Sequence, residues 1–160
     1  MATPMTIGHA RALGWAISDA GMDEELPVTG LAWPEAVQLA TAAGGRLPTS
    51  AEWQWMASAG ARRYPWGEAD PEPGHANLRA LGPGAITPVG AYPVGATPDG
   101  LLDVAGNVWE WTSTCVPGGG AVVRGGSYQS IRLYAQSGFA NEIPTATTSP
   151  GIGLRVVIDT

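Results

Sequence analysis

The residues from 100 to 111 combine carboxylates, an amide, glycines and tryptophans in one short stretch. Asp103 and Glu110 carry hard oxygen atoms, and the backbone carbonyls between them can direct further oxygens at one point. Calcium accepts about six to eight oxygen ligands in irregular geometry, and Gly106 permits the backbone angles of a tight loop. These residue types favour a calcium-binding loop. They also fit an ordinary turn whose tryptophans enter the core and whose acids face water.

Further blocks of residues stand around this stretch in a definite order. They read GRLPTSAEW at 45–53, YPWG at 64–67, ANL at 76–78, GLLDVAGNVWEW at 100–111, RGGSY at 124–128 and GLRVV at 153–157. The ordered blocks resemble the formylglycine-generating enzyme, or sulfatase-modifying factor, family. The resemblance implies an α+β, C-type-lectin-like fold that is loop-rich, with short helices in the N-terminal third and small antiparallel sheets. Variable proteins of diversity-generating retroelements share that fold, and we expect one such domain over residues 1–160.

The resemblance also implies where catalysis would take place. The oxidases of the family hold copper with two cysteines that follow the RGGS block, and copper(I) prefers such soft thiolates. The corresponding positions here are Ser130 and Ala135, and the single cysteine, Cys115, precedes the block. We therefore expect no copper and no catalytic residues of that kind. A related branch uses iron held by three histidines, but this chain has only His9 and His75, far apart in sequence.

The same resemblance adds detail to the calcium hypothesis. The implied ligands are the side chains of Asp103 and Glu110 and the carbonyls of Gly106 and Val108, with Asn77 and the carbonyl of Leu78 at a less favoured second site. Residues 79–87, which would complete the second site, contain no acid. We therefore expect calcium as a structural cofactor at the first site.

The segment between Tyr128 and Ile152 predicts a recognition surface. It mixes small, aromatic and amide side chains, which suit adaptable binding. The candidate binding residues are Tyr128, Gln129, Ser130, Arg132, Tyr134, Gln136, Phe139 and Asn141. In the retroelement variable proteins the diversified residues lie in this part of the fold. We therefore expect a non-catalytic module that binds a protein or glycan ligand, as a variable protein or as a receptor-binding or structural component of a phage.

An enzyme of the same superfamily is the alternative. It would be an oxidoreductase that works in the same groove without the cysteine copper site. Its candidate residues are Tyr128, Ser130, Arg132 and Tyr134. A sample that holds copper or iron and consumes oxygen would favour the enzyme, whereas calcium alone would favour the binding module.

The composition narrows the classes of partner. The net charge is −6 and all 8 basic residues are arginines, which argues against nucleic acid or an anionic membrane surface as partner. No apolar run is long enough to span a membrane. The first residues lack the basic and apolar stretches of a signal peptide, so we expect a cytoplasmic or virion-associated protein. Members of the family that this chain resembles usually have more residues before the first helix. Their absence here would leave apolar surface uncovered, which is compatible with an oligomer or a larger assembly.

Three helices are expected to position these residues. The first begins at the cap Thr6 and runs to about Ala20, with Gly21 as its stop. The second begins near Pro34 and ends at Gly44–Gly45. The third opens with a capping box, formed by Thr49 and Glu52, and runs to about Ala59.

After residue 60 the helical periodicity disappears. The clearest strands are 121–124 and 154–158, and short strands are expected near Val89 and Tyr92. Residues 60–100 contain half of the 14 prolines and indicate a long ordered loop region. Trp66, Trp109 and Trp111 are expected to hold that region to the core, and stacking of one of them on a carbohydrate is the alternative.

Overall fold

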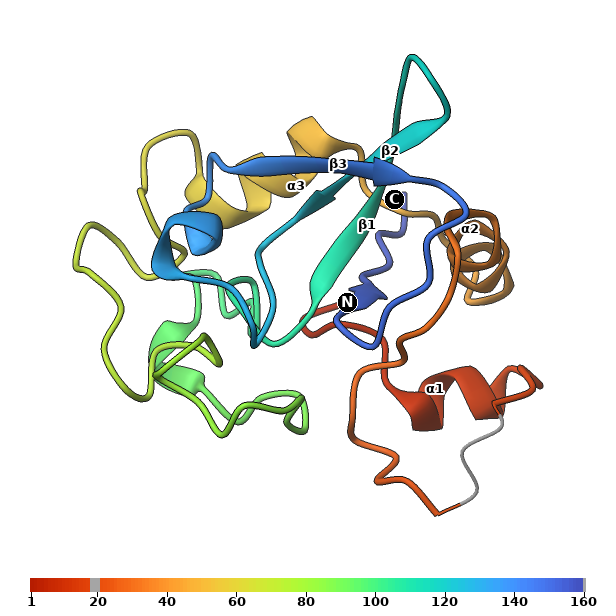
Figure 1. The fold of residues 1–160 in the computed structure, drawn as a ribbon, viewed down its shortest axis with the longest axis horizontal. Helices are drawn as coiled ribbons and strands as arrows, with labels where there is room; N and C mark the ends of the chain where they lie inside the picture. Colours follow the sequence, from red (N-terminus) through yellow and green to blue (C-terminus); the bar gives the residue numbers. More distant parts are fainter. Residues whose placement is uncertain (18–20, 160) are drawn as a thin grey trace.

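The computed structural model describes residues 1–17 and 21–159 and is organised around one small curled sheet (Figure 1). Its strands are β1 (Trp109–Val116), β2 (Gly120–Arg124), β3 (Ala140–Pro144) and β4 (Ile152–Leu154), in the spatial order β3-β2-β1-β4. β1, β2 and β3 pair antiparallel, whereas β4 runs parallel to β1. The α+β class with short helices is confirmed, although the sheet is mixed rather than purely antiparallel.

The β1–β2 hairpin turns at two glycines. Gly118 and Gly119 have φ angles of 94° and 87°, which side chains other than glycine rarely adopt. The strand expected at 121–124 is confirmed as β2, one residue longer at its start. β1 and β3 were not predicted, because β1 begins inside the glycine-rich block. β3 is exposed along most of its length and shows no apolar alternation.

The strand predicted at 154–158 is misplaced. β4 ends at Leu154, and Val157 forms only an isolated bridge with Arg46. The physical reason lies at Arg155, whose side chain is buried and bonds to Glu110 rather than facing solvent. The chain therefore leaves the sheet to place this arginine inside the molecule.

The first helix, α1 (Ile7–Ala12), is shorter than predicted. Its start is as expected, because the Thr6 side chain accepts a hydrogen bond from the His9 amide at 3.2 Å. The predicted extension to Ala20 is wrong as far as Ile17, because the helix ends at Ala12 and Gly14 takes a left-handed conformation with φ 79°. The remainder of that prediction, residues 18–20, lies outside the described residues.

The other two helices match the sequence prediction closely. α2 (Trp33–Ala42) has proline in its first turn, and α3 (Ser50–Ser58) carries the expected capping box between Thr49 and Glu52. α2 contacts β1 and β4, whereas α3 contacts β1 and β2. The two helices thereby support the strands whose ends form the candidate site.

Residues 59–108 form a long loop region that lies beside the sheet, away from α1 and α2 (Figure 1). The short strands predicted near Val89 and Tyr92 are absent from these residues, all of which are described, and a 3₁₀ turn, η1 (Pro93–Gly95), follows instead. Proline has no amide hydrogen to donate to a sheet ladder. The region has its own apolar cluster, made by Tyr64, Ala76, Leu78, Ala105 and Ala135, with Trp66 and Leu81 packed against it.

Three tryptophans were expected to hold the loop region, and they differ in position. Trp111 is fully buried and donates from its indole nitrogen to the Leu31 carbonyl at 3.0 Å. Trp66 is half-buried and stacks on Tyr64 with ring centroids 5.1 Å apart. Trp109 is also half-buried, but its ring belongs to a surface groove described below.

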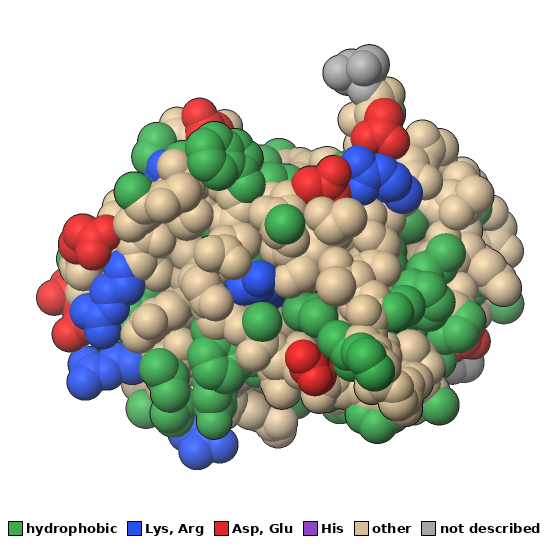
Figure 2. Space-filling model, turned by 90° about the horizontal axis from the view of Figure 1, so that it is seen from above, with side chains coloured by type: hydrophobic (Ala, Val, Ile, Leu, Met, Phe, Trp, Pro, Cys, Tyr) green, Lys and Arg blue, Asp and Glu red, His purple; other side chains and the backbone are tan. Residues whose placement is uncertain are grey.

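The surface carries charges of both signs. On the face shown in Figure 2, some arginines and acidic side chains lie next to one another, and others stand apart among polar and apolar groups. The described residues contain no helix with the length and apolar character needed to cross a membrane.

Candidate functional site

A groove opens where β1, β3 and the segments around them meet. Its larger lobe has a volume of about 330 Å³, and a smaller lobe of about 200 Å³ shares four of its residues. The larger lobe is lined by Trp109, Ser127, Gln129, Ser130, Tyr134, Phe139 and Asn141. The smaller lobe adds Val123, Ile143, Thr147, Ser149, Gly151 and Ile152 to Trp109, Ser127, Gln129 and Asn141. We call these two lobes together the aromatic groove.

Three aromatic rings form one wall of the aromatic groove. The ring centroids of Tyr134 and Phe139 are 4.7 Å apart, and those of Trp109 lie 6.1 Å and 6.2 Å from them. The rings are tilted to one another by 42° to 50°, an arrangement that aromatic pairs favour over a face-to-face sandwich. Tyr134 lies in η2 (Arg132–Ala135), Phe139 directly precedes β3 and Trp109 opens β1. Three separate segments therefore build this wall.

Hydroxyl and amide groups form a second part of the lining, which we call the polar wall. The Ser127 amide donates to Ser130 Oγ at 2.9 Å, and the Gln129 amide donates to Ser127 Oγ at 3.2 Å. In the smaller lobe, Ser149 Oγ accepts from the Gly151 amide at 3.1 Å. Each hydroxyl oxygen is held by a backbone donor, so each hydroxyl proton remains to be donated to a ligand.

The buried side chain of Arg124 connects α3 to the segment that contains Phe139. Its buried guanidinium donates to the Phe139 carbonyl at 3.0 Å, to Ser50 Oγ at 2.9 Å and to Gln54 Oε1 at 3.1 Å. Burial lowers the pKa of Arg124. The contact fixes the backbone at Phe139 relative to α3, and so helps to position the aromatic wall.

Most of the predicted binding residues come together in the aromatic groove. Gln129, Ser130, Tyr134, Phe139 and Asn141 all line it. The other predicted residues, Tyr128, Arg132 and Gln136, do not line either lobe. Arg132 is largely exposed and pairs with Asp70 at 3.4 Å.

Sequence reasoning missed two central residues of the groove. Trp109 was assigned to the core, and Ser127 was not included among the binding residues, yet both line each lobe. Trp109 is paired with Ile152 in the parallel β1–β4 register. Only that pairing brings the Trp109 ring beside the 128–152 segment. Ser127 directly precedes that segment in the sequence, and this position could have indicated that it belongs to the groove.

The two positions that correspond to the family's cysteines lie on one short segment. Ser130 lines the groove, and its hydroxyl accepts a hydrogen bond as described above. Ala135 is buried in the apolar cluster of the loop region. Neither side chain offers a soft donor, which copper(I) would need. Cys115 is exposed in β1, where it pairs with Ala121 of β2.

The predicted calcium ligand Glu110 is already engaged. Its carboxylate forms a buried ion pair with Arg155, with 2.9 Å between Oε1 and Nη2, and accepts from Trp53 Nε1 at 2.7 Å through Oε2. The guanidinium of Arg155 also donates to the carbonyls of Ala2 and Leu102, both at 2.8 Å. A cation beside this carboxylate would face the positive charge of Arg155. In this geometry the side chain of Glu110 does not fit the role of a calcium ligand.

The remaining predicted ligands are also largely bonded within the protein. Asp103 Oδ2 accepts from the Gly90 amide at 2.6 Å, and the Gly106 carbonyl accepts from the Val108 amide at 2.9 Å. Burial raises the pKa of the Asp103 carboxyl above its usual range, against the hydrogen bond from Gly90 and the charge of Arg155. Calcium binding here stays a prediction, and the residues present fit it poorly.

At the less favoured second site, one predicted ligand oxygen is bonded within the protein and the other is not. The Leu78 carbonyl accepts from the amides of Leu81 and Gly82, both at 3.0 Å. Asn77 Oδ1 is buried without a hydrogen-bond partner, while its Nδ2 donates to the Ala85 carbonyl at 2.8 Å. Only the side chain of Asn77 therefore keeps an oxygen for a cation.

The histidines lie apart in structure as well as in sequence. His9 belongs to the N-terminal cap of α1, and the ring of His75 stacks on Trp66 at 4.7 Å. Within residues 1–17 and 21–159, no three His, Cys, Asp or Glu side chains form a group that could hold a metal ion.

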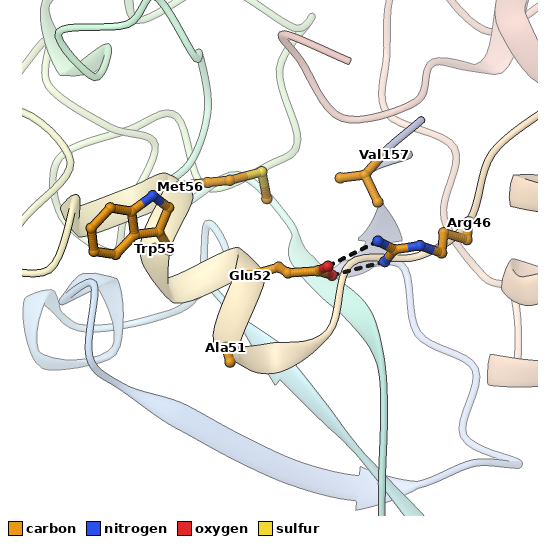
Figure 3. Close-up of a pocket in the computed structure, with 6 residues that line it drawn as sticks. All are labelled: Arg46, Ala51, Glu52, Trp55, Met56 and Val157. Atoms are coloured by element: carbon orange, nitrogen blue, oxygen red, sulfur yellow. Dashed lines mark hydrogen bonds and ion pairs between the residues drawn. The ribbon is translucent and has the colours of Figure 1, made fainter. Parts of the chain in front are cut away.

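A second, larger pocket of about 540 Å³ lies along α3. It is lined by Arg46, Ala51, Glu52, Trp55, Met56 and Val157 (Figure 3). Glu52 points at the Arg46 guanidinium at one end, with two contacts of 2.8 Å, whereas Trp55 and Met56 project from α3 at the other. Arg46 also bonds to Asp159. The charged groups of this pocket satisfy one another and the rest is apolar, so the pocket offers few directed polar contacts to a ligand.

Comparison with known proteins places these features in one family. The model of the sulfatase-modifying factor enzyme 1-like domain matches residues 9–160. The hercynine oxygenase of Mycobacterium tuberculosis is 41% identical in an alignment of 114 residues, which covers 67% of this chain and 26% of that protein. The formylglycine-generating enzyme of Streptomyces coelicolor is 37% identical in an alignment of 153 residues, which covers 75% of this chain and 48% of that protein. The chain thus spans about a quarter to a half of the length of these curated relatives.

Solved structures show the same fold. The crystal structure of CarF matches with a TM-score of 0.78 and 25% identity, covering 99% of this chain and 85% of that one. Treponema denticola variable protein 1 matches with a TM-score of 0.79 and 18% identity, covering 96% of this chain and 81% of that one. The expected architecture, shared between formylglycine-generating enzymes and variable proteins, is confirmed.

Proposed function

Because the chain belongs to the family of sulfatase-modifying factor enzyme 1-like domains, we propose that it uses the scaffold of that family to bind a ligand and not to carry out the family's copper chemistry. The observation that carries the proposal is the replacement of both thiolate positions by Ser130 and Ala135. The groove that Ser130 lines has an aromatic wall and a polar wall. The ligand is a protein segment or a glycan that contacts these two walls.

The shape of the groove supports a binding role. Small-molecule sites are typically concave, mostly apolar and supplied with a few well-placed polar groups. The aromatic groove is concave and combines aromatic rings with several polar groups, and its three rings come from segments that the sheet and Arg124 hold in place. Rigid aromatic side chains give contact area at a low cost in conformational entropy. The same properties suit a fixed receptor-binding or structural role, or a variable protein.

An oxidoreductase is the second candidate, and the 41% identity to the hercynine oxygenase of Mycobacterium tuberculosis favours it. Of the residues named for this alternative, Tyr134 and Ser130 line the groove, whereas Tyr128 and Arg132 lie outside it. A catalytic metal would need ligands other than the two positions of the cysteine pair.

Metal and oxygen measurements on the purified chain separate the two candidates. We expect neither copper nor iron in a stoichiometric amount after exposure to each metal, and no oxygen consumption with a thiol reductant, because none of the described residues that line the groove is a cysteine, methionine or histidine. The control is the same sample after Ser130→Cys and Ala135→Cys substitution, which we expect to gain copper. Stoichiometric copper or iron in the parent chain, together with oxygen turnover, would establish the oxidoreductase instead.

A further inference from the structure

The chemistry of the aromatic groove points to one class of ligand. Resting on the proposed binding function, we propose that the groove is a binding site for a neutral saccharide, which packs on the three aromatic rings and is held by the serine hydroxyls and side-chain amides. Nothing in the groove requires a metal ion for this contact.

The first argument is charge. Among the described residues that line the two lobes, none is Arg, Asp, Glu or His. A charged ligand placed there would lose water without gaining a counter-charge, and burying an unpaired charge is costly. The occupant is therefore expected to be neutral.

The second argument is the aromatic wall. Trp109, Tyr134 and Phe139 are half-buried, so each presents part of its ring to the groove. Sugar rings have apolar C–H faces, and aromatic rings offer large apolar surfaces of matching width. The tilts of 42° and 44° between Trp109 and its two neighbours give the wall a bent rather than a flat surface. A bent wall fits a ligand made of successive rings.

The third argument is the polar wall. A sugar hydroxyl both donates and accepts hydrogen bonds, so a complementary site needs donors and acceptors in pairs. Ser127, Ser130 and Ser149 are each anchored by a backbone amide and keep a proton to donate. The amides of Gln129 and Asn141 carry a donor and an acceptor side by side. Because the serine oxygens are already fixed, little conformational entropy is lost when they bind.

The groove is less suited to a peptide, although β3 is an edge strand beside it. Peptides that add to a sheet edge bind through free backbone donors and acceptors. On β3 the Glu142 amide is already bonded to Asn141 Oδ1 at 2.9 Å, and Pro144 has no amide hydrogen. Proline and locally satisfied donors are features that protect an edge from strand addition. The groove therefore offers mainly side chains, which is how a sugar would be recognised.

The test is a direct binding measurement with defined probes. We would screen the purified chain against immobilised neutral oligosaccharides of glucose, galactose, mannose and N-acetylglucosamine, with uronic-acid and sulfated oligosaccharides in parallel. We expect at least one neutral oligosaccharide to bind and the acidic ones to bind more weakly. In Gln129→Ala and Phe139→Ala variants the affinity should fall about tenfold or more, equivalent to about 1.4 kcal/mol.

Matched controls distinguish the groove from the rest of the surface. Gln38→Ala changes an exposed glutamine on α2, and Trp55→Ala changes a ring that is 66% exposed on α3. Both should bind the saccharide as the parent does. Unchanged melting temperatures in the Gln129→Ala variant would show that its loss of binding does not come from unfolding.

The outcomes separate the ligand class from the binding function. Binding of acidic saccharides alone, or of neutral ones with equal affinity in the Gln129→Ala and Phe139→Ala variants, would overturn the saccharide proposal. The saccharide proposal would also be overturned if no saccharide binds while a peptide selected from a displayed library does. If the Gln129→Ala and Phe139→Ala variants no longer bind that peptide, the binding function itself would stand. Oxygen turnover that the same variants abolish would overturn the binding function itself.

Discussion

At the scale of single residues, Glu110 and Arg155 form an ion pair inside the core, and each neutralises the charge of the other. Each side chain is 1% exposed, and the two carboxylate oxygens meet the guanidinium and the indole of Trp53. The arginine also gathers the carbonyls of Ala2 and Leu102. It thus links β1, the end of β4 and two loops, and it supplies the positive charge beside Glu110.

Removing one partner of this pair should lower the stability of the fold. We expect Glu110→Ala to lower the free energy of unfolding by about 3–5 kcal/mol, because it leaves a buried guanidinium without its counter-charge. Chemical denaturation measures the change. The control is Asp70→Ala at an exposed pair, where the loss should be about 1 kcal/mol or less. Equal small losses in both variants would contradict the role given to the buried pair.

The same pair leads to a prediction about metal removal. A ligand that binds only the folded state raises the melting temperature. Because Arg155 already compensates Glu110, we expect the same melting temperature in calcium and in excess EDTA. A melting temperature that falls in EDTA, recovers with calcium and loses this response in Asp103→Ala would show instead that calcium binds, through Asp103 and carbonyl oxygens.

At the scale of elements, the start of α3 links a helix cap to an ion pair. Glu52 accepts from the Thr49 amide at 2.7 Å and from the Arg46 guanidinium, and Arg46 extends the pairing to Asp159 near the end of the chain. The hydrogen bonds from Arg46 and Thr49 lower the pKa of Glu52 from 4.5 to about 2. The pKa of Asp159 is lowered by Arg46 as well.

These shifts predict how stability depends on pH. A carboxyl whose pKa is lower in the folded state stabilises the fold above its unfolded pKa and loses that contribution as pH falls. The contribution of Glu52 should therefore be complete above pH 4.5 and fade toward pH 2. Asp103 acts in the opposite direction, since its pKa is raised. Melting curves of the parent and of Glu52→Gln should converge as the pH falls through this range, and a constant difference would contradict the prediction.

At the scale of the whole molecule, one buried side chain near the start of β1 binds two distant parts of the long loop region. The buried amide of Asn107 accepts from the Thr87 amide at 2.9 Å and donates to its carbonyl at 3.0 Å, and Asn77 Nδ2 donates to it at 3.1 Å. Asn107 has φ 66° and lies two residues before β1. The segments around Asn77 and Thr87 are thereby held at the start of β1.

Removal of that side chain should loosen the loop region before the sheet. We expect Asn107→Ala to cost about 2–4 kcal/mol, because several buried hydrogen bonds are lost together. Hydrogen exchange should rise at Asn77 and Thr87 more than in β1 and β2. The control Asn141→Ala changes an exposed asparagine in β3 and should leave exchange at Thr87 unchanged. A uniform rise across the sheet and the loop region would mean that the two do not open separately.

The sequence by itself determined the features that depend on neighbouring residues and on an ordered set of motifs. The caps of α1 and α3 follow from Thr6 and Thr49, because side-chain capping acts within one turn. The motif order identified the fold, and Ser130 and Ala135 predict that no thiolate copper site forms at these positions, because ligand chemistry depends on residue type.

Only the tertiary structure decided which distant groups meet. Glu110 and Arg155 are 45 positions apart, and their contact gives the carboxylate a partner that local spacing did not indicate. Trp109 joined the groove through the parallel pairing of β1 with β4, and β3 formed without an apolar pattern. Long-range pairing sets these contacts, and no local preference of the residues involved encodes it.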